Sequence, residues 1–94
     1  MQITVNVGDV VESLSGRDKG TAYLVVKTEN GTALVTDGRK RKVNNLKTKN
    51  VKHLRVLVAQ PLNGLAIKIQ KGEPVGNERV YRSVKSEKQK LQED

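Results

Sequence analysis

Closely spaced turn signals constrain the fold of this 94-residue chain more than any other feature of its sequence. Ser15-Gly16, Asn30-Gly31 and Asp37-Gly38 each separate short apolar segments. Asn-Gly and Asp-Gly are preferred sequences of two-residue hairpin turns. Such turns at regular, short spacing predict a series of short strands in the first part of the chain.

The segments between these turns give five expected strands. Residues 21–28 contain the run Tyr23-Leu24-Val25-Val26, which is apolar on both faces, as is typical of a strand covered on two sides. Residues 44–50 are polar and are expected to form a loop. The expected strands are residues 7–14, 21–28, 32–36, 39–43 and 51–58. Short strands joined mostly by tight turns predict a mainly β, SH3-like five-stranded barrel, with a small five-stranded sandwich as the alternative.

The pattern becomes helical after residue 60. Pro61 suits a first helical position, and Gly72 followed by Pro74 is a typical helix stop. Asn77 is expected to cap a second helix with a thin apolar stripe. The apolar residues at helical spacing in the first helix are Leu62, Leu65, Ala66 and Ile69.

Two regions are therefore expected within one small protein. Residues 1–58 form the barrel domain, and residues 59–94 form an extension of one or two short helices with a frayed end. The first of these helices is expected to pack on the outer face of the barrel and to provide the second cover that residues 23–26 require.

Positive charge is concentrated in one stretch of the sequence. The chain has 18 Lys and Arg against 10 Asp and Glu, a formal charge of +8, and residues 39–55 contain eight basic residues and no acidic one. A local excess of this kind attracts a polyanion, for which nucleic acid is the first expectation. An anionic lipid surface and a merely solvated basic face are the alternatives. The eight residues are Arg39, Lys40, Arg41, Lys42, Lys47, Lys49, Lys52 and Arg55.

Several function classes find no support in the composition. The chain has no Cys and a single His, His53, so we expect no catalytic triad, no metal site, no cofactor and no small-molecule substrate. The apolar runs are too short for a membrane span, and the segment after Met1 does not resemble a signal peptide. A non-enzymatic, cytoplasmic protein is expected.

The segments Val7-Gly8-Asp9-Val10-Val11 and Ser15-Gly16-Arg17-Asp18-Lys19-Gly20, followed by an apolar strand, resemble the KOW motif of ribosomal proteins and transcription elongation factors. The basic segment at 37–43 and the Lys-His-Leu run within 49–54 are similar to small bacterial KOW-domain RNA-binding proteins, which are themselves similar to archaeal and eukaryotic large-subunit ribosomal proteins. The resemblance covers residues 7–57. It implies an SH3-like barrel that binds RNA, often ribosomal RNA, without catalysis.

The residues themselves agree with an RNA-binding interpretation. Arg17 and Lys19 can extend the basic surface, and Gly20 either serves a turn with positive φ or lets a phosphate backbone approach. Tyr23 is expected in the core, so Tyr81 alone cannot build a stacking platform, and contacts should be mainly to phosphate and sugar. We expect a ribosome-associated RNA-binding protein, with ribosomal RNA as its main partner and ribosomal proteins as further candidates. The alternative is an SH3-like adaptor docking on RNA polymerase or on a ribosomal component.

Overall fold

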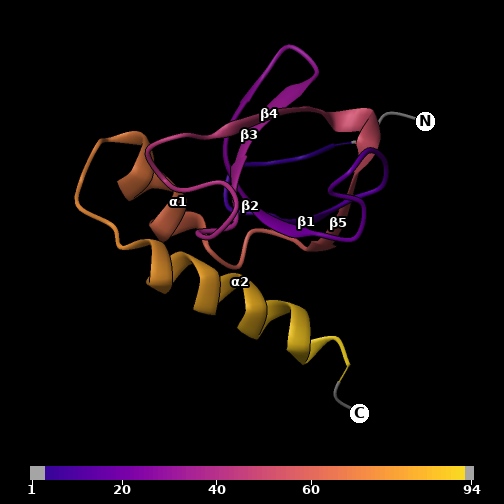
Figure 1. Ribbon diagram of the computed structural model, residues 1–94. Coiled ribbons are helices and arrows are strands. Elements are labelled where there is room, and N and C mark those ends of the chain that lie inside the picture. The colour runs from indigo at the N-terminus through magenta and orange to yellow at the C-terminus, as the bar shows by residue number, and fades with distance from the viewer. Residues whose placement is uncertain (1–3, 93–94) are drawn as a thin grey trace.

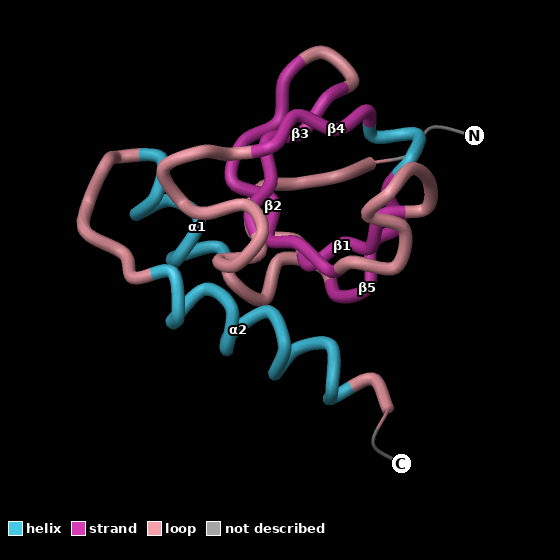
Figure 2. Tube along the Cα trace, viewed as in Figure 1, coloured by secondary structure: helices cyan, strands magenta, loops and turns pink. Residues whose placement is uncertain are grey.

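Five strands are followed by two helices in the computed structural model, which describes residues 4–92 (Figures 1 and 2). The elements are β1 (Val10–Ser13), β2 (Ala22–Glu29), β3 (Thr32–Thr36), β4 (Lys47–Asn50), a 3-10 turn η1 (Val51–His53), β5 (Leu54–Val58), α1 (Asn63–Gln70) and α2 (Asn77–Lys90). The chain is a small mixed α/β domain, and both expected helices are confirmed. The end of the extension was expected to fray; α2 continues to Lys90, and the last two residues, 93–94, lie outside the described residues.

All five strands belong to one antiparallel sheet with the order β4-β3-β2-β1-β5. Between β2 and β3, Asn30 and Gly31 both have positive φ, 44° and 82°, as the tight hairpin predicted from the Asn-Gly pair requires. The number of strands is as predicted, but the sheet is not closed as a barrel. β4 and β5 are its two edges, and η1 carries the chain from one edge to the other.

The fourth strand lies later in the sequence than predicted. Residues 39–43 are not a strand but part of the loop between β3 and β4 (Figure 2). The Asp37 carboxylate accepts hydrogen bonds from the backbone N–H groups of Arg39, at 3.0 Å, and Arg41, at 2.8 Å, and so holds this segment in a tight turn. The ladder with β3 is formed instead by Lys47–Asn50, which was expected to be a loop because Lys and Asn are poor strand formers.

The last strand is also shorter than predicted. Residues 51–53, expected to open a strand over 51–58, form η1 instead. The Asn50 side chain accepts a hydrogen bond from the Lys52 backbone N–H, at 2.9 Å, and this local bond favours a turn over an extended chain. β5 therefore begins at Leu54.

The core has two parts, one on each face of the sheet. Side chains alternate along β2, so Tyr23 and Val25 face one side and Leu24 and Val26 the other, and all four are buried. The first part contains Val5, Val11, Tyr23, Val25, Ala33, Val35 and Leu54. The second contains Val10, Leu24, Val26, Leu65, Ala66, Val80 and Val84. The expectation that the first helix covers the second face of β2 is confirmed, and α2 covers it as well (Figure 1).

Two glycines let the helices approach the sheet closely. Gly8 has a φ of 90°, and a Cβ placed on it would lie 2.6 Å from the Asn63 Cα at the start of α1. Gly38 has a φ of 76°, and its Cβ would meet the Asn77 carbonyl and lie 2.8 Å from the Tyr81 nitrogen of α2. Because no other residue fits these positions without strain or displacement, each helix is docked through a glycine turn.

Asn77 does not cap α2 with its side chain, contrary to the sequence-based expectation. The N-cap is Gly76, with no side-chain cap. The Asn77 Oδ1 atom instead accepts a hydrogen bond from the Val43 backbone N–H, at 2.8 Å. Asn77 therefore ties the loop between β3 and β4 to the first turn of α2.

Candidate nucleic-acid interface

The most basic segment of the sequence, residues 39–42, is displayed on a turn whose shape does not depend on its own side chains. Besides the two bonds to Asp37, the Thr36 hydroxyl donates to the Arg41 carbonyl oxygen, at 2.6 Å. Lys40 and Lys42 are exposed, and Arg41 is half-buried. Their side chains are therefore available to a ligand while the backbone is held in place by residues 36 and 37.

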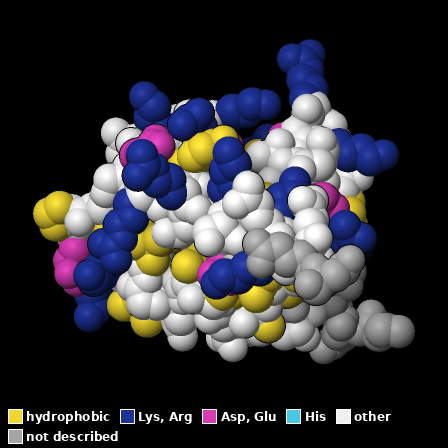
Figure 3. All heavy atoms as spheres, turned by 90° about the horizontal axis from the view of Figure 1, so that it is seen from below, with side chains coloured by type: hydrophobic (Ala, Val, Ile, Leu, Met, Phe, Trp, Pro, Cys, Tyr) yellow, Lys and Arg dark blue, Asp and Glu magenta, His cyan; other side chains and the backbone are white. Residues whose placement is uncertain are grey.

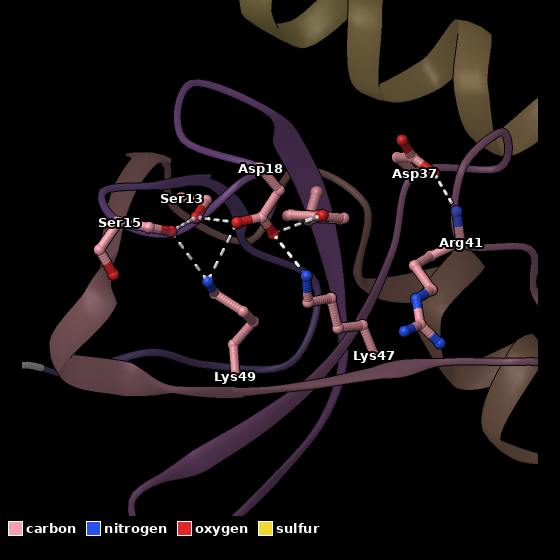
Figure 4. Close-up of polar contacts among 8 residues, drawn as sticks. Ser13, Ser15, Asp18, Asp37, Arg41, Lys47 and Lys49 are labelled. Atoms are coloured by element: carbon pink, nitrogen blue, oxygen red, sulfur yellow. Dashed lines mark hydrogen bonds and ion pairs between the residues drawn. The ribbon is translucent and has the colours of Figure 1, made fainter.

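Lys47 and Lys49, two of the predicted RNA contacts, both pair with a buried carboxylate. Their ammonium groups lie 3.1 Å and 3.2 Å from the Asp18 oxygens, and Lys49 is only 9% exposed (Figure 4). Asp18 also accepts hydrogen bonds from the Tyr23 hydroxyl, at 2.7 Å, and from the Ser13 hydroxyl, at 2.8 Å. These contacts link β1, β2 and β4, so both lysines serve the fold, and Lys49 is closed to a phosphate.

The Asp18 cluster also shifts two ionisation equilibria. Burial alone would raise the pKa of the Asp18 carboxyl, but the hydrogen bonds from Tyr23, Ser13, Lys47 and Lys49 together hold this pKa well below its usual value. Burial, followed by the hydrogen bond to Asp18, raises the pKa of the Tyr23 phenol well above its usual value. Asp18 is thus a carboxylate and Tyr23 a neutral phenol throughout the neutral range.

Arg39 and Arg55 also have acidic partners that come from distant parts of the chain. The Arg55 guanidinium lies 2.7 Å from Glu12, and that of Arg39 lies 3.4 Å from Glu78 on α2. Both arginine side chains are more than half exposed, so solvent screens these pairs and the arginines can still exchange partners. Among residues 39–55, the cations with no acidic partner within the described part of the chain are Lys40, Arg41, Lys42 and Lys52.

A cleft of about 340 Å³ lies between α2 and the start of β2. One wall is the stripe of α2 that carries Tyr81, Val84, Lys85 and Lys88. The opposite wall is formed by Gly20, Thr21, Ala22 and Asp37, and Gln89 and Gln92 complete the lining. The Lys88 ammonium donates a hydrogen bond across the cleft to the Gly20 carbonyl oxygen, at 3.4 Å.

Tyr81 places an aromatic ring in this cleft. The Arg39 guanidinium lies over the ring, 3.8 Å from its centroid, and the Lys85 ammonium lies 5.8 Å from it. Tyr81 is half-buried, whereas Tyr23 is 1% exposed, as expected for a core residue. A partly accessible ring bordered by cations is an arrangement suited to a planar, negatively charged ligand such as a nucleotide.

Sequence reasoning missed α2 as part of the surface. The sequence predicts that Tyr81 alone cannot build a stacking platform, and the charge count places the excess at residues 39–55 rather than on α2. The spacing of Tyr81, Lys85 and Lys88 contains the signal that could have found them, because positions i, i+4 and i+7 lie on one face of a helix. Lys and Arg side chains predominate over Asp and Glu on the face seen in Figure 3.

Arg17 and Lys19 are exposed on the turn that leads into the cleft at Gly20. Gly20 has a φ of 91°, so the turn itself accounts for the glycine, one of the two expectations for it. A Cβ at this position would meet no atom within 4 Å, so the space beside the Gly20 Cα is also open to a ligand. The approach of a phosphate stays a prediction.

The sequence matches no protein-family model, and no curated protein is similar to it at a significant level. Within residues 4–92, no group of three or more His, Cys, Asp or Glu side chains is placed to hold a metal ion. Neither of the helices described, α1 nor α2, has the length and apolar character needed to cross a membrane.

Proposed function

We propose that this protein is a non-catalytic RNA-binding module that holds structured RNA mainly by phosphate and sugar contacts. The observation that carries the proposal is spatial. Lys85 and Lys88 of α2 line one cleft together with the Tyr81 ring, and Arg39 of the 39–42 turn lies over that ring. The exposed Arg17 and Lys19 stand on the turn that leads to Gly20, which also lines the cleft. Phosphate contacts supply most of the affinity in complexes of this kind, and they need cations on one surface rather than in one stretch of sequence.

The KOW resemblance supports ribosomal RNA as the target and an SH3-like barrel as the fold class. The position of β1 between β2 and β5 is compatible with a barrel left open between β4 and β5. On this proposal Lys40, Lys42, Arg17, Lys19 and the two cleft lysines make the main contacts. Lys52 and Arg55 add weaker ones, and Lys47 and Lys49 act through Asp18.

The test compares two variants that lose the same charge from different places. One replaces Lys40, Lys42, Lys85 and Lys88 by Gln. The matched control replaces four cations outside the cleft that are exposed and have no acidic partner within the described chain: Lys27, Lys68, Lys71 and Arg79. Binding to a ribosomal RNA hairpin is measured by fluorescence anisotropy over a range of salt concentrations, and thermal unfolding confirms that both variants fold.

For the unmodified protein, contact with about five phosphates predicts a slope of about −3.5 to −4.5 for log affinity against log salt. The first variant should lose at least tenfold in affinity at low salt, with the slope reduced by about one for each phosphate that the variant no longer neutralises. The control should keep its slope. Equal losses of RNA affinity in the two variants would refute the placement of the RNA-binding surface around the cleft.

RNA binding no stronger than that of an unrelated basic protein of similar charge would refute the proposed function. That result would leave the adaptor alternative, in which the same charges dock on an acidic protein surface. RNA crosslinking in cells, followed by sequencing of the crosslinked RNA, tests whether the target is ribosomal.

A further inference from the structure

We infer that the cleft between α2 and β2 binds one unpaired RNA base, packed against Tyr81, while the chain around it holds the backbone. This inference rests on the proposed function and specifies the kind of RNA that the site prefers: a structured RNA with an extruded nucleotide. Four features of the cleft carry it, namely its aromatic ring, its dimensions, the sign of its charges and the open backbone at its mouth.

The ring is the first feature. Tyr23 is buried and hydrogen-bonded to Asp18, so Tyr81 is the aromatic side chain of this protein that a base can reach. Arg39 already lies on the ring at 3.8 Å, and RNA-binding proteins stack bases on arginine planes as well as on aromatic rings. A base in the cleft can therefore extend the existing stack of Arg39 on Tyr81. One ring serves one base, which agrees with the expectation that the protein has no extended stacking platform.

The second feature is size and shape. The volume of about 340 Å³ is at the lower end of the range of about 300–1,000 Å³ for small-molecule sites. Ala22 and Val84 give the cleft apolar surface beside the ring. A base inside a duplex cannot enter such a cleft because its neighbours hold it in the stack, whereas a bulged or loop nucleotide can be turned out into it.

The charges orient the nucleotide. Lys85 and Lys88 stand on the α2 side of the cleft and can hold the phosphate of the bound nucleotide. On the other wall, Asp37 is 8% exposed, and its Oδ1 atom accepts the backbone N–H groups of Arg39 and Arg41. A carboxylate there repels phosphate but accepts the N–H groups that base edges carry. The base therefore points toward Asp37, and its phosphate toward the lysines.

Gly20 forms the mouth of the cleft on the β2 side. Since no atom lies within 4 Å of the place a Cβ would take, the flanking RNA backbone can run close to the turn that carries Arg17 and Lys19. The same RNA strand can thus contact this turn and place its extruded base between β2 and α2.

The experiment uses the full chain and three RNA hairpins of one sequence. The first stem is fully paired, the second carries a single bulged 2-aminopurine, and the third carries an abasic bulge that has the same backbone but no base. We expect the base-containing bulge to bind about tenfold more tightly than the other two, since stacking of one base has an effect of this size. The fluorescence of 2-aminopurine should fall on binding as the base stacks.

Two variants of Tyr81 and one control locate the effect. Tyr81→Leu should bind all three hairpins with nearly equal affinity, and Tyr81→Phe should keep the preference for the base-containing bulge. Arg79→Gln, two residues away on α2 and so on roughly the opposite side of the helix, removes a charge but should not change the preference.

Equal affinity of the unmodified protein for the base-containing and abasic bulges would overturn the inference while leaving the proposed function intact. A preference that survives in a folded Tyr81→Leu variant would also overturn it. Absence of specific binding to all three hairpins would refute the proposed function itself. Since the comparison among hairpins is made on the unmodified chain, the inference can be refuted even if the leucine variant does not fold.

Discussion

Replacement of Asp18 by Asn tests whether Lys47 and Lys49 belong to the fold or to the RNA surface. In the protein the Asp18 carboxylate receives both lysine ammonium groups together with the hydroxyls of Tyr23 and Ser13. An amide of the same shape can still accept hydrogen bonds through its oxygen, but it carries no charge. The variant therefore isolates the electrostatic role of this residue from its packing.

The size of the effect follows from the burial of the partners. Removal of one member of a buried ion pair costs about 3–5 kcal/mol, and Lys49, at 9% exposure, would be left without a counter-charge. The Lys47 side chain is 30% exposed and can turn to solvent, so it adds little. We therefore expect Asp18→Asn to lower the free energy of unfolding by about 3 kcal/mol, the lower end of this range. In a domain of this size each kcal/mol lowers Tm by roughly 4–8 °C, so Asp18→Asn should lower Tm by roughly 12–24 °C.

The effect should depend on pH in a defined direction. In the folded protein the pKa of Asp18 lies well below the ordinary value of 3.8, so in acid the unfolded chain takes up the proton first. The stability that Asp18 contributes is fully present well above pH 3.8 and is lost as the pH falls below that value. Urea denaturation should therefore show a constant difference between the unmodified protein and Asp18→Asn from about pH 6 to 8, and a smaller one at about pH 3.

Glu12→Gln is the matched control, because Glu12 forms a shorter ion pair, 2.7 Å, with the well exposed Arg55. Pairs of this kind contribute about 0–1 kcal/mol, so this variant should unfold close to the unmodified protein. The structural role of Asp18 is refuted if its replacement costs no more than that of Glu12, or if the loss is the same at pH 3 and pH 7. In either case Lys47 and Lys49 return to the set of RNA contacts.

Two further predictions concern the docking of the helices. Gly38→Ala should destabilise the protein by about 2–5 kcal/mol, because strain at positive φ adds to the close contact of the new Cβ with α2. Gly20→Ala should cost only about 1–2 kcal/mol, because it has the strain but no such contact. Equal losses of stability in thermal unfolding would contradict docking through Gly38. A chain ending at Gln60 should fail to give a well-dispersed NMR spectrum, because it uncovers Leu24 and Val26, and a folded monomer would instead support the predicted division into residues 1–58 and 59–94.

The sequence predicts best the elements that are determined by local signals. β3 coincides with the predicted strand 32–36 because the Asn-Gly turn fixes where it begins. The fourth strand was predicted wrongly because two local influences act against each other there. The Asp37 carboxylate folds the β-like segment 39–43 into a turn, while β4 owes its pairing to β3 and to the inward contact of Lys49 with Asp18. A lysine that points inward has no signature in a single sequence.

The charge distribution of the candidate surface could be predicted only in part, for a similar reason. A count along the chain places all excess charge at residues 39–55, yet the acids that neutralise part of it, Glu12, Asp18 and Glu78, come from β1, the following turn and α2. Conversely, α2 carries five Lys and Arg against two Glu, but acidic residues elsewhere in the chain balance this local excess, so the count outside residues 39–55 shows no surplus. The count also does not show that Lys85 and Lys88 share a face with Tyr81. The surface potential depends on how the charged side chains are arranged in space, not on the sum of charges along the sequence.

The contacts that dock α2 on the sheet both complete the core and form the cleft. Val80 and Val84 cover the face of β2 that would otherwise be exposed, and Gly38 lets the helix come close enough to do so. The same approach brings Tyr81 and Lys88 opposite Gly20 and so creates the cleft. A ligand that touches both walls binds only the docked form and stabilises it. Changes that loosen α2 must therefore weaken both folding and binding in the cleft, whereas changes to the exposed lysines at its rim weaken binding alone.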